Sequence, residues 1–161
     1  MFLDMDVVGF SLVDAENDIY LFDINNGDTL DFDVLEATYG TEQFTIVCNT
    51  TGPVESTILS DPYRGENAEG TAPWALSGDD GLGDFFPTPF RDNAGNWNVT
   101  CQPFCGPGQT GAAGAAEFVN FDITFRDCTV CQEGCIFITG KPEPFVYKNG
   151  ALCAVLTSCL V

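Results

Sequence analysis

The sequence predicts an all-β fold in which two layers of antiparallel strands pack face to face. Turn-forming residues are frequent: the 161 residues include 17 Gly and 9 Pro, and with Asn and Asp these interrupt the chain about every ten residues. The segments between the interruptions are short and rich in Val, Ile, Thr and Phe, which favour strands. Apolar residues rarely recur at helical spacing. This combination is typical of a β-sandwich.

Eight strands are expected within the first 126 residues. They cover 7–13, 18–24, 28–35, 42–50, 53–60, 72–78, 96–103 and 117–126. In the last strand, Phe118, Phe121, Ile123 and Phe125 are expected to face the core, with a slip near Asn120 that a β-bulge would accommodate. The small residues of 106–114 are interpreted as a long flexible connection before that strand.

Two of these strands predict a disulfide bond through the middle of the sandwich. Side chains alternate between the two faces of a strand, so Cys48 points away from Asn49 and Cys101 points away from Asn98. Each asparagine begins an N-x-T sequon, and a glycan on it needs solvent. Both cysteines therefore face the core. A Cys48–Cys101 bond would close a loop of about 53 residues and stabilise the fold by about 4 kcal/mol.

The eight cysteines and the two sequons together indicate a secreted or cell-surface protein. An even number of cysteines is what a fully paired set requires, and disulfide bonds persist outside the reducing cytosol. A reduced zinc protein is the rival interpretation, because Cys128, Cys131 and Cys135, with Cys153 or Cys159, could supply four thiolates. It would leave four other cysteines without a role, and it does not explain the sequons.

Charge and composition exclude several functions. The formal net charge is −19, from 24 Asp and Glu against 5 Lys and Arg, and contacts with nucleic-acid phosphates need clustered basic side chains. The chain contains no His, which excludes His-based catalytic triads and His-ligated metals. Nothing in the sequence distinguishes one pair of carboxylates as the acid and base of a glycosidase, so we expect no enzymatic activity. Binding to DNA or RNA is not expected either.

The sequence also lacks the marks of membrane insertion. The opening ten residues have neither a basic region nor a long apolar region, and no run reaches the ~18 apolar residues of a membrane-spanning helix. We therefore expect no membrane insertion. For an extracellular protein, this start predicts that the chain is a fragment or mature segment of a longer precursor.

The sandwich is expected to span residues 1–126 and to be followed by a Cys-rich extension, 127–161. Strands are expected there at 135–139 and 144–148, with 151–157 pairing back across the turn-forming pair Asn149-Gly150. The pairing of the cysteines outside the central bond stays open, since six thiols allow 15 arrangements. These are Cys105, Cys128, Cys131, Cys135, Cys153 and Cys159.

Several segments resemble bacterial-type immunoglobulin-like domains, modules that recur in large surface and adhesive proteins. Segments 71–76 (TAPWAL), 97–101 (WNVTC) and 121–125 (FDITF) resemble their late strands, and 8–33 is similar to their first strands. The resemblance covers about residues 6–126 and implies an immunoglobulin-like antiparallel β-sandwich acting as a spacer, an adhesin or a substrate-binding attachment.

The chain departs from that family in three respects. The usual modules lack the Cys48–Cys101 pair and have no counterpart of 127–161. The tryptophan that follows the first cysteine of antibody domains is also missing, because Trp74 comes too late in the chain for that role.

Acidic loops are the candidate metal sites. Asp79, Asp80 and Asp84 lie in a Gly-rich loop whose carboxylates suit calcium, although the spacing is not that of an EF-hand. A second acidic group lies near Asn25 and Asn26 and consists of Asp28, Asp31 and Asp33. A solvated acidic surface is the preferred interpretation of both groups, and calcium is the alternative.

Aromatic residues are the candidate ligand contacts. Phe85, Phe86 and Phe90 fall in the Pro- and Gly-rich loop 81–90, and Trp74 precedes them. Exposed rings there could stack on sugars or dock into a partner. The preferred interpretation is that the loop folds back and covers the end of a sheet.

The expected function is that of a structural or adhesive module of a larger extracellular glycoprotein or filament. Its partners would be other extracellular chains or copies of itself. The alternative is a carbohydrate-binding module that contacts glycans through the 81–90 loop, with or without calcium. A secreted hydrolase is the least favoured hypothesis.

Overall fold

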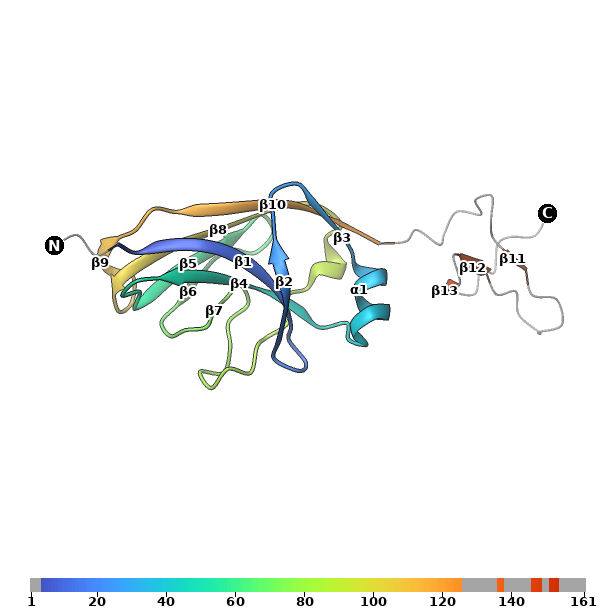
Figure 1. Ribbon diagram of the computed structural model, residues 1–161, viewed down its shortest axis with the longest axis horizontal. Helices are drawn as coiled ribbons and strands as arrows, with labels where there is room; N and C mark the ends of the chain where they lie inside the picture. Colours follow the sequence, from blue (N-terminus) through green and yellow to red (C-terminus); the bar gives the residue numbers. More distant parts are fainter. Residues whose placement is uncertain (1–3, 126–135, 138–145, 149–150, 154–161) are drawn as a thin grey trace. The chain divides into compact units, whose positions relative to one another are not determined.

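The computed structural model describes residues 4–125, 136–137, 146–148 and 151–153 (Figure 1). The chain divides into two compact units, Met1–Phe125 and Arg126–Val161, and each is described by itself. The first unit is built from two β-sheets and one α-helix. The second contains a small three-stranded sheet.

The first sheet has the strand order β2-β1-β4-β7, and its neighbouring strands are antiparallel. Its members are β1 (Asp6–Asp14), β2 (Ile19–Ile24), β4 (Phe44–Thr51) and β7 (Trp74–Ala75). β1 and β2 form a hairpin, and β4 pairs with the full length of β1. The register shifts between Val7 and Gly9, which brings Gly9 opposite Asn49.

The second sheet has the order β3-β10-β8-β5-β6, and β9 pairs with β8 beside this path. Its members are β3 (Asp28–Asp31), β5 (Ser56–Asp61), β6 (Gly65–Glu69), β8 (Gly95–Gly106), β9 (Thr110–Ala113) and β10 (Glu117–Thr124). β3 pairs with β10 in parallel, and the other pairs are antiparallel. The long strand β8 therefore lies in the middle of the sheet.

An apolar core fills the space between the sheets. It combines inward side chains of both sheets with Phe32 and Leu35 of the helix α1 (Phe32–Tyr39), which lies at one end of the sandwich (Figure 1). Trp97 is fully buried, and its ring centroid lies 4.8 Å from that of Phe90. Burial of each such side chain stabilises the fold by about 1.5–3 kcal/mol.

The predicted disulfide bond is confirmed. Cys48 of β4 and Cys101 of β8 are bonded between the two sheets, with their Cα atoms 6.4 Å apart. Both cysteines belong to the buried core. On the opposite faces of these strands, Asn98 is exposed and Asn49 is half-buried. The alternation of side chains therefore places both cysteines and both asparagines as the sequence indicates.

A second apolar cluster covers the outer face of the first sheet. Four small or branched side chains lie on that face, and Phe85 packs on them at 5% exposure. They are Val13, Ala15, Val47 and Ala75. Phe85 comes from the segment 76–88, which is tied along β4: Leu76 N donates to Ile46 O and Thr88 N donates to Phe44 O, each at 2.8 Å. This segment therefore folds over the outer face as a cover.

The structure corrects the expected strand 28–35. β3 ends at Asp31, and helix α1 follows directly. Asp31 caps the helix by accepting a hydrogen bond from a backbone N–H of the first turn at 3.1 Å, and Gly40 ends it in the left-handed region, with φ 76°. Phe32 and Leu35 are spaced three apart and bury one helical face, whereas Leu30, Phe32 and Val34 alternate as the residues of a strand do.

The expected facing at the start of β10 is also wrong. β10 pairs with β8 without a register shift, so the slip expected at Asn120 is absent. Continuous alternation turns Val119 inward at 3% exposure and leaves Phe118 52% exposed on the outer face. The inward facing of Phe121 and Ile123 is confirmed. Pairing register, rather than side-chain size, decides which residue faces the core.

Other strands differ in extent. β7 covers only two residues of the expected 72–78, and β6 forms where no strand was expected. The segment 106–114 is not a long flexible connection, because its residues form β9 and turn back onto β8. A Cβ on Gly106 would lie 2.6 Å from the hydroxyl oxygen of Thr110, so glycine is what permits this close approach.

The second unit contains the strand order β11-β12-β13, with antiparallel pairs. The strands are β11 (Ile136–Phe137), β12 (Val146–Lys148) and β13 (Ala151–Cys153). Lys148 pairs with Ala151, as expected for a hairpin across Asn149-Gly150. The remaining parts of the expected strands 135–139, 144–148 and 151–157 lie outside the described residues. In the described part of the chain, no helix has the length and apolar character needed to span a bilayer.

Candidate functional site

The acidic loop predicted as a calcium site uses its carboxylates to hold its own turn. Asp79 accepts a hydrogen bond from Gly81 N at 2.5 Å. Asp80 accepts from Leu82 N at 2.7 Å and from Asp84 N at 3.1 Å. Within residues 4–125, no group of three or more Cys, Asp or Glu side chains is placed to hold a metal ion. The loop therefore has the chemistry of a folded acidic turn.

The second acidic group is also used in local structure. Asp28 accepts a hydrogen bond from Asn25 N at 2.7 Å, and Asp31 caps α1. Asp33 lies 3.8 Å from a guanidinium nitrogen of Arg91. These three carboxylates serve a turn, a helix start and an ion pair, and they do not converge on one point.

The four aromatic residues predicted as ligand contacts separate into a buried group and one exposed ring. Trp74, Phe85 and Phe90 are no more than 6% exposed, whereas Phe86 is 48% exposed. The Trp74 indole nitrogen donates to the Thr50 hydroxyl at 2.9 Å. Only Phe86 among the four has a ring open to a ligand. Phe85 packs on the outer face of the first sheet, whereas Trp74 and Phe90 belong to the core between the sheets. This packing agrees with the preferred interpretation that the loop folds back, and the alternative of exposed rings is wrong for these three residues.

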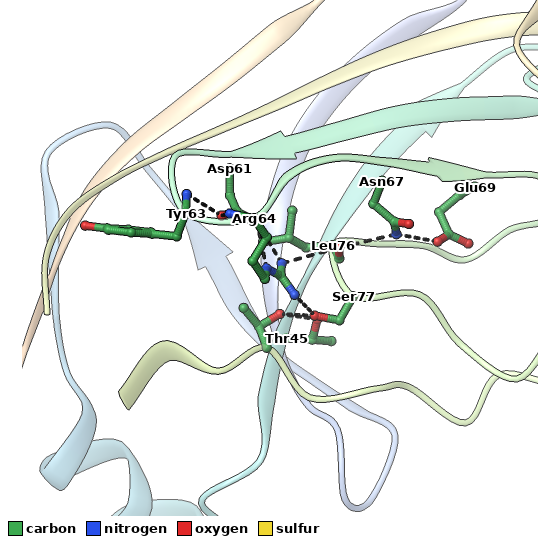
Figure 2. Close-up of polar contacts among 9 residues, drawn as sticks. Thr45, Asp61, Tyr63, Arg64, Asn67, Glu69, Leu76 and Ser77 are labelled. Atoms are coloured by element: carbon green, nitrogen blue, oxygen red, sulfur yellow. Dashed lines mark hydrogen bonds and ion pairs between the residues drawn. The ribbon is translucent and has the colours of Figure 1, made fainter. Parts of the chain in front are cut away.

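A polar network centred on Arg64 lies beside the turn between β5 and β6 (Figure 2). Arg64 donates from Nε to Asp61 at 2.9 Å and from Nη1 to the Ser77 hydroxyl at 2.5 Å. The Asp61 carboxylate is 1% exposed and also accepts the backbone N–H groups of Tyr63 and Arg64, each at 2.9 Å. With a further bond from Arg64 Nη2 to Leu76 O at 3.4 Å, five hydrogen bonds and one ion pair involve these two oppositely charged residues.

The network continues into the interior through hydroxyl groups. The Ser77 hydroxyl lies 2.7 Å from that of Thr88, which lies 3.0 Å from that of Thr45 in β4. A cavity of about 220 Å³ opens beside Arg64 and is lined in part by Leu76. Because the guanidinium is already paired and hydrogen bonded, we interpret the network as the fastening of the 76–88 segment to both sheets.

The carboxylates of Glu69 and Asp79 repel each other near this network. Burial raises the pKa of the Glu69 carboxyl, and the negative charge of Asp79 raises it further, although a hydrogen bond from Asn67 lowers it. One carboxylate oxygen of Asp79 is buried without a hydrogen-bond partner among the described residues. Protonation of Glu69 would relieve this repulsion, so the repulsion is sensitive to pH.

A groove on the outer face of the first sheet contains the first sequon asparagine. We call it the Asn49 groove; its volume is about 370 Å³, and its lining includes Tyr20, Val47, Asn49, Thr50, Ala72 and Pro73. Tyr20 is half-exposed and stands edge-on to Phe85, with ring centroids 6.0 Å apart. Burial raises the pKa of the Tyr20 phenol, and Asp79 raises it further. The phenol therefore stays protonated near neutral pH.

The Asn49 side chain is oriented by a short relay of hydrogen bonds. Its Nδ2 donates to the Ser11 hydroxyl at 2.8 Å, and that hydroxyl donates to Asp23 at 2.7 Å. Asn98, in the other sequon, lies exposed on the outer face of the second sheet and donates to Asn120 at 2.6 Å. One sequon amide thus lies at a groove and the other on an exposed strand face.

The remaining cysteines are only partly described. Cys105 lies half-buried in β8, forms no disulfide with a described residue, and accepts a hydrogen bond from Ala112 N at 3.2 Å. The other predicted disulfide cysteines are Cys128, Cys131, Cys135, Cys153 and Cys159, whose side chains lie outside the described residues.

Sequence reasoning did not identify Arg64, Ser11 or Tyr20 as site residues. Arg64 could have been noticed as one of two basic residues among the first 100. Nothing in the sequence distinguishes Tyr20 and Ser11, because their closeness to Asn49 depends on the order of the strands in the sheet. The chain matches no protein-family model, no curated protein and no solved structure.

Proposed function

We propose that the first unit is an immunoglobulin-like structural or adhesive module of a larger secreted or cell-surface glycoprotein. It would act without enzymatic activity, as part of an extracellular assembly or filament. Its partners would be other extracellular chains or further copies of itself. The observation that carries the proposal is the buried Cys48–Cys101 bond, because it joins the two sheets covalently at their centre.

The position of that bond suits a load-bearing role in an oxidising compartment. Force that separates the sheets must act against a covalent link as well as against the apolar core. The bond encloses a sequence separation of 53 residues, which corresponds to about 4 kcal/mol of stabilisation in the chain-entropy model. A bond of this kind persists outside the reducing cytosol.

The order of the strands supports the immunoglobulin-like part of the proposal. In immunoglobulin domains a disulfide joins the second strand, B, to the sixth, F, between one sheet with A, B and E and another with C, F and G. Here β1, β4 and β7 are neighbours in one sheet, β10, β8 and β5 are neighbours in the other, and the bond joins β4 to β8. Leu59 of β5, opposite Cys101, is buried at the place near the disulfide where antibody domains carry tryptophan.

The alternative of a carbohydrate-binding module that uses the 81–90 loop is less well supported. It requires exposed rings, and Phe85 and Phe90 are buried. Calcium is not required by the proposal, because the carboxylates of the loop already hold backbone N–H groups.

The proposal is tested on cells that make the protein. Intact cells are labelled with a membrane-impermeant amine reagent, and the protein is recovered with an antibody against residues 4–125. We expect a labelled, glycosidase-sensitive protein within a complex that contains further chains. An unlabelled protein that carries free thiols at Cys48 and Cys101 would contradict the proposal.

A further inference from the structure

We infer that Asn49 carries an N-linked glycan whose first sugar lies in the Asn49 groove and stabilises the sandwich. The inference rests on the proposed function in one respect, since it requires passage through a compartment that glycosylates sequons. It goes further by giving one of the two sequons a structural role and by naming the residues that hold the sugar.

The hydrogen bonds of Asn49 leave room for this modification. The amide Nδ2 has two N–H bonds, of which one donates to Ser11 and the other meets no hydrogen-bond acceptor among the described residues. Glycosylation forms a bond between Nδ2 and C1 of the sugar and breaks the bond from C1 to a lipid-linked diphosphate donor. The displaced amide proton balances the charge on the departing diphosphate. One N–H remains, so the bond to Ser11 can be kept.

The surroundings of Asn49 leave space for a sugar ring. The residue directly opposite on β1 is Gly9, and a Cβ built there would meet no heavy atom within 4 Å. The groove of about 370 Å³ falls in the range of small-molecule pockets, ~300–1,000 Å³. A sugar attached at Nδ2 is tethered at this space, so it loses much less entropy on entering the groove than a free ligand loses on binding.

The walls of the groove offer the chemistry that a sugar needs. The half-exposed Tyr20 ring, held in place by its contact with Phe85, presents apolar surface to the apolar C–H groups of a pyranose. Pro73 and Val47 add further apolar surface. The hydroxyl of Tyr20 and the carboxylate of Asp23, an exposed residue, are polar groups on the same sheet.

Asn98 is the natural control. It also begins a sequon, but it lies exposed in the centre of the second sheet beside Asn120. A glycan there would extend into solvent and would contribute little to stability. The two sequons therefore predict different consequences for glycans of the same chemistry.

The test uses the full chain secreted from a eukaryotic host and the same chain made without glycosylation. Mass spectrometry first measures occupancy at both asparagines. An endoglycosidase then trims each glycan to one sugar, and melting temperatures are compared between Thr51→Ala, which removes the first sequon, and Thr51→Ser, which keeps it. Thr51 is exposed, and neither change alters Asn49. Thr100→Ala and Thr100→Ser form the matched pair for Asn98.

We expect occupancy of Asn49 and a melting temperature about 2–4 °C lower when its sugar is absent, with a change below about 1 °C for the sugar on Asn98. The unglycosylated variants correct for effects of the substitutions themselves. In a Tyr20→Ala background the effect of the Asn49 sugar should fall to less than about half, whereas Tyr20→Phe should retain it.

Three outcomes would overturn the inference. Asn49 bare while Asn98 is glycosylated excludes the modification. If Tyr20→Ala leaves the effect of the Asn49 sugar on the melting temperature unchanged, the sugar does not lie in the Asn49 groove. In these first two cases a glycan on Asn98 and an intact Cys48–Cys101 bond would leave the proposed extracellular function standing, whereas two bare sequons, the third outcome, would contradict both the inference and that function.

Discussion

The two faces of β4 are built differently although their residues alternate along one strand. On the face of Cys48, the side chains of Phe44, Ile46 and Cys48 are buried by the second sheet and the disulfide bond. The opposite face changes along its length: Val47 is buried beneath the 76–88 segment, whereas Asn49 opens onto the Asn49 groove. Alternation thus identifies the face that meets the other sheet. The covering of the outer face is decided by a segment about thirty residues further along the chain.

The largest expected effect comes from breaking the inner face. The double variant Cys48→Ala, Cys101→Ala should lose about 4 kcal/mol of unfolding free energy, because the unfolded chain is no longer cross-linked over a separation of 53 residues. Urea unfolding of the oxidised protein and the variant measures this difference. An unchanged midpoint would mean that the bond adds nothing to the sandwich.

Removing the cover of the outer face is expected to cost somewhat less. Phe85→Ala should destabilise the fold by about 3 kcal/mol, since a ring that is 5% exposed leaves a cavity over Val47 and Ala75. The matched control is Phe86→Ala, one residue further on at 48% exposure, which should change stability by less than about 0.5 kcal/mol. Chemical denaturation of both variants compares them. Equal losses would show that the segment does not cover the sheet as described.

The fastening of that cover should have a smaller effect. Arg64→Met should destabilise by about 1–2 kcal/mol, because it leaves the Asp61 carboxylate, 1% exposed, without its charged partner. Arg91→Met is the matched control: its guanidinium pairs with Glu36 and lies over the Phe125 ring at a more exposed position, and we expect a loss below about 1 kcal/mol. Thermal unfolding of both variants at low and high salt measures the two losses of stability. A larger loss of stability in Arg91→Met than in Arg64→Met would contradict the role of Arg64 in fastening the 76–88 segment.

Much of this architecture could be predicted from the sequence, and the limits have physical causes. The inward facing of Cys48 and Cys101 follows from alternation, which is a local property. The helix after Asp31 was missed because Leu30, Phe32 and Val34 alternate as in a strand, and the signals of a helix are the cap at Asp31 and the glycine at Gly40.

The candidate site was harder to predict for a different reason. Phe85 and Phe86 are adjacent and chemically identical, yet one covers a sheet and the other is exposed. The composition of the loop does not distinguish them. The Asn49 groove likewise depends on strand order, because Tyr20 and Asn49 come from strands separated by β1.

The smallest expected effect is a pH dependence at the edge of the cover. The pKa of Glu69 is raised above its ordinary value of 4.5, mainly by burial and then by Asp79. Its folded-state pKa therefore exceeds the unfolded one, so unfolding free energy falls as pH rises through these two values. Glu69→Gln removes this loss and should be more stable than the parent at pH 7, by less than about 1 kcal/mol.

The same variant offers its own control at low pH. Below about pH 4 the Glu69 carboxyl is protonated in both states, so the difference from Glu69→Gln should vanish. In an Asp79→Asn background the difference at pH 7 should narrow, because the repelling charge is gone. Melting temperatures across pH 3–8 provide the comparison. A difference that persists at low pH would assign the effect to packing instead.

The most direct test of the disulfide-linked sandwich is peptide mapping of the protein taken from its own cells. Free thiols are blocked before digestion, and the peptides are analysed without reduction. We expect the peptide with Cys48 to be joined to the peptide with Cys101 in nearly all molecules. Recovery of both cysteines as blocked free thiols would contradict the covalent link between the sheets.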